Sequence, residues 1–230
     1  MKKVVILLII IFLFSCNISA QEDKLIYKCA NTEENKIALT FDDGPHPRQT
    51  KEILSVLDKY GVKATFFVIA QNATYYPDVL RLIADEGHEI GNHTFSHLDM
   101  KKSKNRDIRN EIIKSEDFIY ELCHYNTRLF RPPGGVINSE IIETAKELNY
   151  KIVLWDIDTR DWAHRGVNEI VNNISDNVKN GSIILFHDYI SRNSPTPEAL
   201  DKIIPLLKEK GFSFVCVSEL ISNKQRTNAR

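Results

Sequence analysis

The sequence of 230 residues has few cysteines, almost no net charge and a single long hydrophobic run. Its 30 basic and 31 acidic residues leave a formal net charge of −1, so no strong electrostatic attraction to nucleic acid is expected. Nine glycines and eight prolines argue against a fibrous or low-complexity chain. With 43% hydrophobic and 27% charged residues, the composition predicts one globular domain.

The four cysteines form no Cys-x-x-Cys pair, which argues against a zinc ribbon or a thioredoxin-type redox site. Cys216 lies in the apolar run 214–217 and is expected to be a small buried hydrophobic residue. A disulfide between Cys29 and Cys123 is an alternative that an oxidising compartment would allow.

The hydrophobic run covers residues 4–14 and follows Lys2 and Lys3. It is short for a bilayer span but suits the apolar core of a signal peptide, which we expect over residues 1–20. The small residues that end at Ala20 fit a signal peptidase site, whereas residues 13–16 resemble a lipobox that would place a lipid on Cys16. Either cleavage predicts an exported protein, periplasmic, secreted or anchored as a lipoprotein; an uncleaved membrane anchor is the third alternative.

Beyond this segment, short β-branched runs alternate with segments of helical periodicity. The expected strands are 37–41, 64–69, 89–91, 128–131, 151–155, 182–187 and 212–217. The expected helices are 51–60, 77–86, 108–123, 139–148, 168–178 and 197–210. Four of these helices are followed by a glycine that suits a left-handed C-cap, namely Gly61, Gly87, Gly181 and Gly211. This alternation predicts a parallel sheet or a (β/α) barrel.

Chemically capable residues fall where the expected strands end, which is the edge where active sites of parallel α/β folds assemble. Asp42 and Asp43 follow strand 37–41. One carboxylate would bind a metal ion while the other handles a proton. The alternative is an Asp-Gly turn with no function.

His93 and His97 are spaced so that one face of a helical turn would present both to a divalent ion. Zinc proteases of similar spacing carry a Glu between the histidines as base, but here Thr, Phe and Ser intervene, which leaves Asp42 for that task. With Asp43, the histidines would make a His₂-carboxylate set with an open position, as expected of a catalytic ion. The alternative is two unrelated polar histidines.

Residues 131–135 read Arg-Pro-Pro-Gly-Gly. Arg131 would hold Asp42 ionised, and a backbone N–H near Gly134 would bind a developing oxyanion. The alternative is a rigid loop with a solvated arginine.

The last two motifs contain Asp161, Trp162, Leu185 and His187. A histidine at a strand end with a carboxylate partner suits a general acid. Trp162 and Leu185 would offer an apolar pocket for a methyl group. The alternatives are core packing for Trp162 and a hydrogen-bonded buried histidine for His187.

Taken in chain order, the motifs from Thr40 to His187 resemble those of the polysaccharide deacetylases with NodB homology, carbohydrate esterase family 4. The resemblance covers about residues 36–221, with a lead-in over 21–35 and a polar tail over 222–230. It implies an α/β fold, a distorted (β/α) barrel of seven or eight strands. One departure is Gly134, where family members often have an aromatic residue. Without that ring, the bound sugar would be covered less closely at this position.

The resemblance also implies roles for individual residues. One divalent ion, Zn²⁺ or alternatively Co²⁺, Ni²⁺ or Mn²⁺, would be bound by Asp43, His93 and His97. Proton transfer would fall to Asp42 as general base, oriented by Arg131, and to His187 as general acid, tuned by Asp161. The acetyl pocket would be lined by Trp162 and Leu185, and the amide near Gly134 would serve the oxyanion.

The expected activity is hydrolysis of N-acetyl groups from N-acetylglucosamine residues of peptidoglycan, an exopolysaccharide or chitin-like oligomers, with release of acetate. The partner is then an acetylated amino-sugar polymer, and neither nucleic acid nor a stable protein partner is implied. An O-acetyl esterase acting on xylan or another glycan would use the same site. A carbohydrate-binding envelope protein with a dead site is the alternative from another class. Residues 191–197 are expected to form part of the site's rim.

Overall fold

The computed structural model describes residues 24–163, 165–190 and 193–222. The expected signal peptide with Cys16, and the tail beyond Ser222, lie outside these residues. Within the described ranges, no helix combines the length and the apolar character that a membrane span requires.

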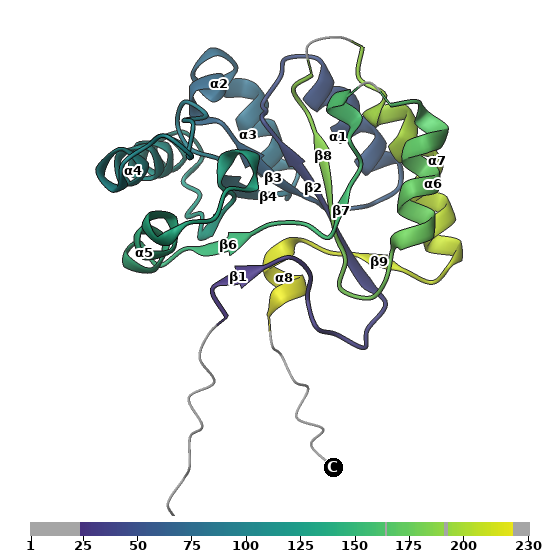
Figure 1. The fold of residues 1–230 in the computed structure, drawn as a ribbon. Helices are drawn as coiled ribbons and strands as arrows, with labels where there is room; N and C mark the ends of the chain where they lie inside the picture. Colours follow the sequence, from purple (N-terminus) through teal and green to yellow (C-terminus); the bar gives the residue numbers. More distant parts are fainter. Residues whose placement is uncertain (1–23, 164, 191–192, 223–230) are drawn as a thin grey trace, which may run out of the picture.

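A curled sheet of nine strands forms the centre of the molecule (Figure 1). Its main path runs β1–β6–β5–β4–β3–β2–β8–β7, while β9 pairs with β2 on its own. The strand pairs are parallel throughout, with bounds β1 Ile26–Tyr27, β2 Lys36–Asp42, β3 Thr65–Val68, β4 Glu89–Asn92, β5 Leu129–Phe130, β6 Lys151–Val153, β7 Ile157–Asp158, β8 Ile183–His187 and β9 Ser213–Phe214. Among the described strands, β1 and β7 at the two ends of this path do not pair with each other, so the barrel is not closed.

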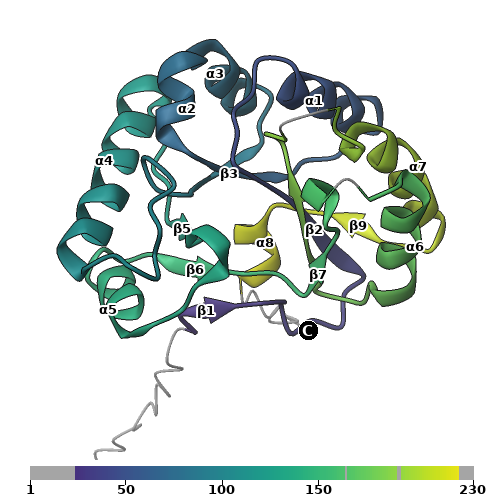
Figure 2. The same ribbon diagram turned by 45° about the horizontal axis from the view of Figure 1, so that its top comes forward.

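Most helices lie outside this curled sheet (Figure 2). Their bounds are α1 Gln49–Lys59, α2 Ala70–Tyr75, α3 Pro77–Asp85, α4 Asn105–Cys123, α5 Ser139–Glu147, α6 Val167–Asn177, α7 Thr196–Glu209 and α8 Val217–Ile221. Short 3₁₀ turns occupy Pro133–Gly135 and Asp161–Ala163. The predicted parallel α/β barrel is confirmed in this curled and open form.

Alternation along the strands separates two cores. In β2, Ile37, Leu39 and Phe41 pack against the outer helices, whereas Ala38 belongs to a cluster inside the curl. Thr40 and Asp42 continue the inward face and are buried as well. Because successive side chains of a strand point to opposite sides, one apolar strand can bury a hydrophobic face outward and aim polar groups inward.

The prediction of one strand over 212–217 was wrong in extent. Only Ser213–Phe214 is a strand, and α8 begins at Val217. The first amides of α8 find acceptors on neighbouring strands: Val217 N–H donates to Thr65 Oγ1 (2.9 Å) and Ser218 N–H to Glu89 Oε2 (3.2 Å). These bonds satisfy donors that a helix start leaves open, so the chain turns into a helix here. The sequence patterns also missed β1, β7 and α2.

The cysteines differ from expectation in two ways. Cys29, Cys123 and Cys216 are all free thiols, so the Cys29–Cys123 disulfide is not formed. Cys216 is only partly buried, because it precedes α8 rather than lying inside a strand.

Gly91→Ala tests the packing inside the curl. A Cβ at Gly91 would lie 2.3 Å from the ring of Phe67, which is fully buried. We expect this substitution to lower the free energy of unfolding by about 1–3 kcal/mol, measured by urea denaturation. Gly166→Ala is the control, because no atom lies within 4 Å of its Cβ position. Equal losses in both variants would contradict this packing argument.

Candidate active site

The predicted site residues converge at the carboxyl end of the sheet, at the top of Figure 1. Asp42 ends β2 and His187 ends β8, and the two strands pair with Asp42 opposite His187. Asn92 ends β4 and is followed by His93, while Arg131 follows β5. Parallel pairing therefore brings distant segments to one edge.

Asp43, His93 and His97 form a cluster whose ligand atoms all lie within 4.8 Å of one another. Asp43 Oδ1 is 3.4 Å from Nε2 of each histidine. The Nδ1 of His93 donates to the backbone oxygen of Arg131 (2.7 Å), which leaves Nε2 free as a ligand. Two imidazoles and one carboxylate are a donor set that suits a divalent transition metal such as zinc, so the residues fit the predicted ion.

Burial by itself would raise the pKa of Asp43, but the hydrogen bond and charge of His93, with His187 and His97, lower it below the usual value. Burial would lower the pKa of His93, but the charges of Asp42 and Asp43 raise it overall. The raised pKa of His93 means that protons compete with a metal ion for this ligand, so metal affinity should fall as the pH falls.

The backbone at this cluster is not the helical turn that the spacing of His93 and His97 predicted. Residues 93–98 form an irregular loop in which Thr94 (φ 71°) and His97 (φ 59°) are left-handed, and Asp43 (φ 78°) is left-handed too. Local bonds hold the loop: Thr94 N–H donates to Asn92 Oδ1 (2.8 Å) and His97 N–H to Thr94 Oγ1 (3.0 Å). Such backbone strain persists only where the surroundings determine it.

Arg131 is completely buried and pairs with Asp42, with 2.7 Å between Nη1 and Oδ1. The same nitrogen donates to Thr40 Oγ1 (2.9 Å). Nε and Nη2 donate to the backbone oxygens of Val153 and Leu154, each at 3.0 Å. The alternative of a solvated arginine is therefore excluded, and the expected pairing with Asp42 is present.

His187 and Asp161 form the second expected pair, with 2.8 Å between Nδ1 and Oδ1. Asp161 also accepts from the His187 amide (2.8 Å), from Thr196 Oγ1 (2.7 Å) and from the Trp162 amide (2.9 Å), so its carboxylate is fixed by four donors. Burial lowers the pKa of His187, but the hydrogen bond and charge of Asp161, helped by Asp42 and Asp43, raise it to about 9. Thr196 lies in the predicted rim segment, of which residues 191–192 fall outside the described ranges.

The three predicted substrate-pocket residues have different surroundings. Leu185 is buried on the inward side of β8, two residues before His187. Trp162 is 54% exposed next to Asp161, which excludes core packing. Gly134 is exposed and left-handed (φ 64°) in the turn after Arg131.

Asp188 is a site residue that sequence reasoning missed, although it directly follows His187. It is buried, and its two carboxylate oxygens accept from the Gly44 amide (2.8 Å) and from Thr50 Oγ1 (2.6 Å). A Cβ at Gly44 would lie 2.0 Å from Asp188 Oδ2, so only glycine fits beside this carboxyl group. Burial raises the pKa of Asp188 to about 7. This contact ties the loop that carries Asp43 to the end of β8.

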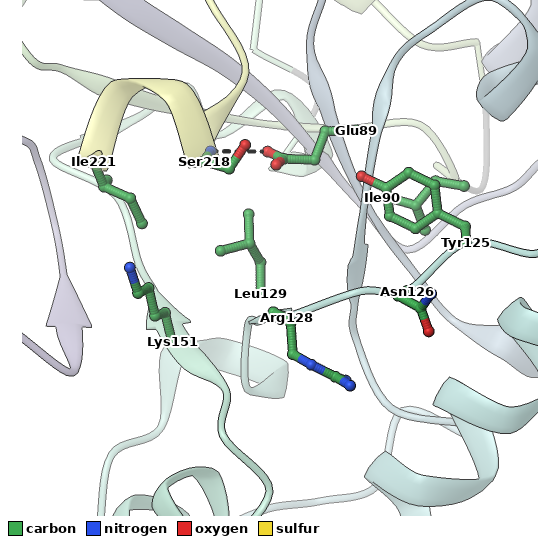
Figure 3. A pocket seen from close by; sticks show the side chains of 9 residues that line it. All are labelled: Glu89, Ile90, Tyr125, Asn126, Arg128, Leu129, Lys151, Ser218 and Ile221. Atoms are coloured by element: carbon green, nitrogen blue, oxygen red, sulfur yellow. Dashed lines mark hydrogen bonds between the residues drawn. The ribbon is translucent and has the colours of Figure 1, made fainter. Parts of the chain in front are cut away.

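A cavity of about 290 Å³ lies at the opposite edge of the sheet, where β4, β5 and β6 begin (Figure 3). Two of its charged groups have partners: Glu89 accepts from Thr65 Oγ1 (2.7 Å) and from the Ser218 amide, and Arg128 pairs with Glu116. Because this cavity lies where the strands begin and the metal cluster lies where they end, it is not the candidate site.

Comparison with known proteins agrees with this geometry. The polysaccharide deacetylase family model matches residues 30–153. A peptidoglycan-N-acetylglucosamine deacetylase of Bacillus cereus is 45% identical over 83% of this chain and 90% of its own length. A crystal structure of a peptidoglycan N-acetylglucosamine deacetylase superposes with a TM-score of 0.84 at 40% identity, covering 87% of this chain and 94% of that one.

A family 4 acetyl xylan esterase of Clostridium thermocellum, solved with a cobalt ion, gives a TM-score of 0.74 at 35% identity over 80% of this chain and 89% of that one. With a parallel curled sheet and an Asp-His-His cluster at its carboxyl edge, the chain belongs to the polysaccharide deacetylase family.

Asp42→Asn and Asp43→Asn distinguish the roles of the two adjacent carboxylates. Asp42→Asn leaves the buried guanidinium of Arg131 without its counter-charge, so we expect a loss of about 3 kcal/mol in the free energy of unfolding of the metal-free protein. Asp43→Asn should cost less stability but abolish tight zinc binding. Urea denaturation and zinc titration measure the two effects, and an equal stability loss in both variants would contradict the Arg131 pairing.

Asp161→Asn should lower the pKa of His187 from about 9 toward the ordinary value of about 6.5, followed by NMR titration of the imidazole. Because the folded pKa is raised, the stabilisation from this pair is complete below about pH 6.5 and disappears as the pH rises through about 9. Asp158→Asn is the control. An unchanged pKa in Asp161→Asn would show that Asp161 does not tune His187.

Proposed function

We propose that this protein is a metal-dependent N-deacetylase of an N-acetylglucosamine polymer, and that peptidoglycan is its substrate. The main support is the arrangement of three functions at one edge: a ligand cluster, the Arg131-paired carboxylate of Asp42, and the Asp161-paired imidazole of His187. The Bacillus cereus relative is named for this activity, and its sequence aligns with 83% of this chain.

A divalent ion held by Asp43, His93 and His97, which we propose to be Zn²⁺, would polarise the acetamide carbonyl and acidify a water molecule when bound. The cobalt ion in the acetyl xylan esterase makes Co²⁺ an alternative. The other residues of the site would transfer protons and stabilise the charge that develops during the reaction.

Asp42 acts as the general base and takes the proton of the attacking water. Arg131 holds this carboxylate in place through the Nη1–Oδ1 bond. The backbone amide near Gly134 donates to the oxyanion of the tetrahedral intermediate. No side chain is needed at Gly134 for this role.

His187 acts as the general acid and protonates the leaving amine, after which acetate is released. Its raised pKa keeps the imidazole protonated at neutral pH, and Asp161 fixes its orientation through Nδ1. Trp162 and Leu185 are proposed to contact the acetyl methyl group.

The O-acetyl esterase is the second candidate, because the acetyl xylan esterase has a similar fold and an ester needs no different groups. The dead-site alternative has no support from the geometry, since the ligands, the base and the acid are all present. We further propose that the protein is exported through residues 1–20, where it would meet cell-wall glycans.

Acetate release from N-acetylglucosamine oligomers and from peptidoglycan tests this proposal, with the protein metal-loaded and metal-stripped. We expect release only with metal, and a loss of at least about a hundredfold in kcat for Asp42→Asn, because general-base catalysis contributes at least that factor. Asp158→Asn is the control for a carboxylate outside the cluster. Release only from O-acetylated glycans would favour the esterase, and failure to bind metal would favour the binding protein.

A further inference from the structure

Exposed aromatic side chains gather around the candidate active site. Among the described residues, five large hydrophobic side chains are exposed, at Tyr75, Tyr120, Ile137, Trp162 and Tyr189. Four of them lie in segments that follow the carboxyl ends of strands, after β3, β5, β7 and β8. The exception is Tyr120, in the last turn of α4. Exposed aromatic surface that collects at one edge of a fold indicates a binding surface.

Two of these tyrosines belong to a continuous row of rings, here called the aromatic ridge: Tyr75, Tyr76, His46 and Tyr189. The ring centroids of Tyr75 and Tyr76 are 6.3 Å apart, and those of Tyr76 and His46 are 6.4 Å apart. His46 meets Tyr189 edge to face at 4.8 Å. The ridge thus connects the end of β3 with the end of β8.

The ridge is attached directly to the candidate catalytic loops. Asn72, one turn before Tyr76, donates from Nδ2 to the backbone oxygen of Asp43 (2.7 Å). Tyr189 lies two residues after His187. The side chain of Gln49 fixes the following residue, Ile190, because it accepts from the Ile190 amide (2.8 Å) and donates to the Ile190 backbone oxygen (2.7 Å). The ridge is therefore continuous with the site on the side formed by the loops after β2 and β8.

The ring of His46 is also fixed in orientation. Its Nδ1 accepts from the amides of Arg48 (3.2 Å) and Gln49 (3.0 Å), at the start of α1. Burial and the charge of Arg48 lower the pKa of His46, which disfavours the charged imidazolium. The ridge consequently combines one ring that is fixed in orientation with three tyrosine rings that carry hydroxyl groups.

We infer that the aromatic ridge binds a pyranose unit of the glycan chain next to the sugar that is deacetylated; this rests on the proposed function. The C–H faces of a pyranose pack on aromatic rings, while tyrosine hydroxyls bond the sugar hydroxyls. The ridge is built of rings and hydroxyl groups, which fits packing on a pyranose and hydrogen bonds to its hydroxyls better than charge pairing with a peptide. The ridge gives the enzyme a preference for longer glycan chains.

Chain-length dependence of activity tests the inference. Tyr189→Ala and Tyr75→Ala should lower kcat/KM for the N-acetylglucosamine hexamer about threefold to tenfold, the loss of one aromatic contact, and change that for the dimer less than about twofold. Tyr189→Phe should retain most of the hexamer activity. Tyr120→Ala should have no effect, because it removes a tyrosine outside the ridge whose exposure (49%) lies between those of Tyr75 (66%) and Tyr189 (37%).

Equilibrium binding of the hexamer to the metal-stripped full chain separates this inference from the proposed function. Weaker binding in Tyr189→Ala and Tyr75→Ala, but not in Tyr120→Ala, supports the ridge even if the wild type releases no acetate, a result that would overturn only the deacetylase assignment. Equal hexamer affinity in all variants, no binding by the wild type, or equal loss of activity on dimer and hexamer would overturn the ridge as a sugar site.

Discussion

The buried guanidinium of Arg131 connects the segments of the chain that form the candidate active site. Its nitrogens bond Asp42 and Thr40 on β2 and the backbone after β6, and its own backbone oxygen accepts from His93. A buried cation has to be compensated, so the surrounding groups have little freedom to move. The orientation of the proposed base and of one metal ligand therefore depends on the same side chain.

A second constraint is the backbone of the metal cluster. Asp43, Thr94 and His97 are non-glycine residues in the left-handed region, where side chains are disfavoured. Bonds from Asn72 and Asp188 to the loop of Asp43, and from Asn92 to Thr94, offset this strain. The ligands are thus held by a shell of buried polar groups rather than by regular secondary structure.

The sequence predicted the strand–helix alternation and the convergence of the chemical groups, because long apolar strands and strand-end motifs carry strong local signals. Short elements such as β1 and β7 were missed, since two residues show no periodicity. The loop around His97 was misjudged because spacing cannot reveal a left-handed backbone. Asp188 was overlooked, and Thr196 was predicted only as part of a rim segment, because their bonds are to partners that are far away in the sequence.

The position of α8 has a consequence for how the chain folds. Val217, Leu220 and Ile221 complete the cluster inside the curl, together with Phe67, Leu129 and Ile183. β9, just before α8, pairs with β2 near the start of the described chain. Contacts between segments so distant in sequence form late, because a long loop must close first. The interior cluster therefore stays open to water until residues 217–221 pack into it, so closure of this core depends on α8.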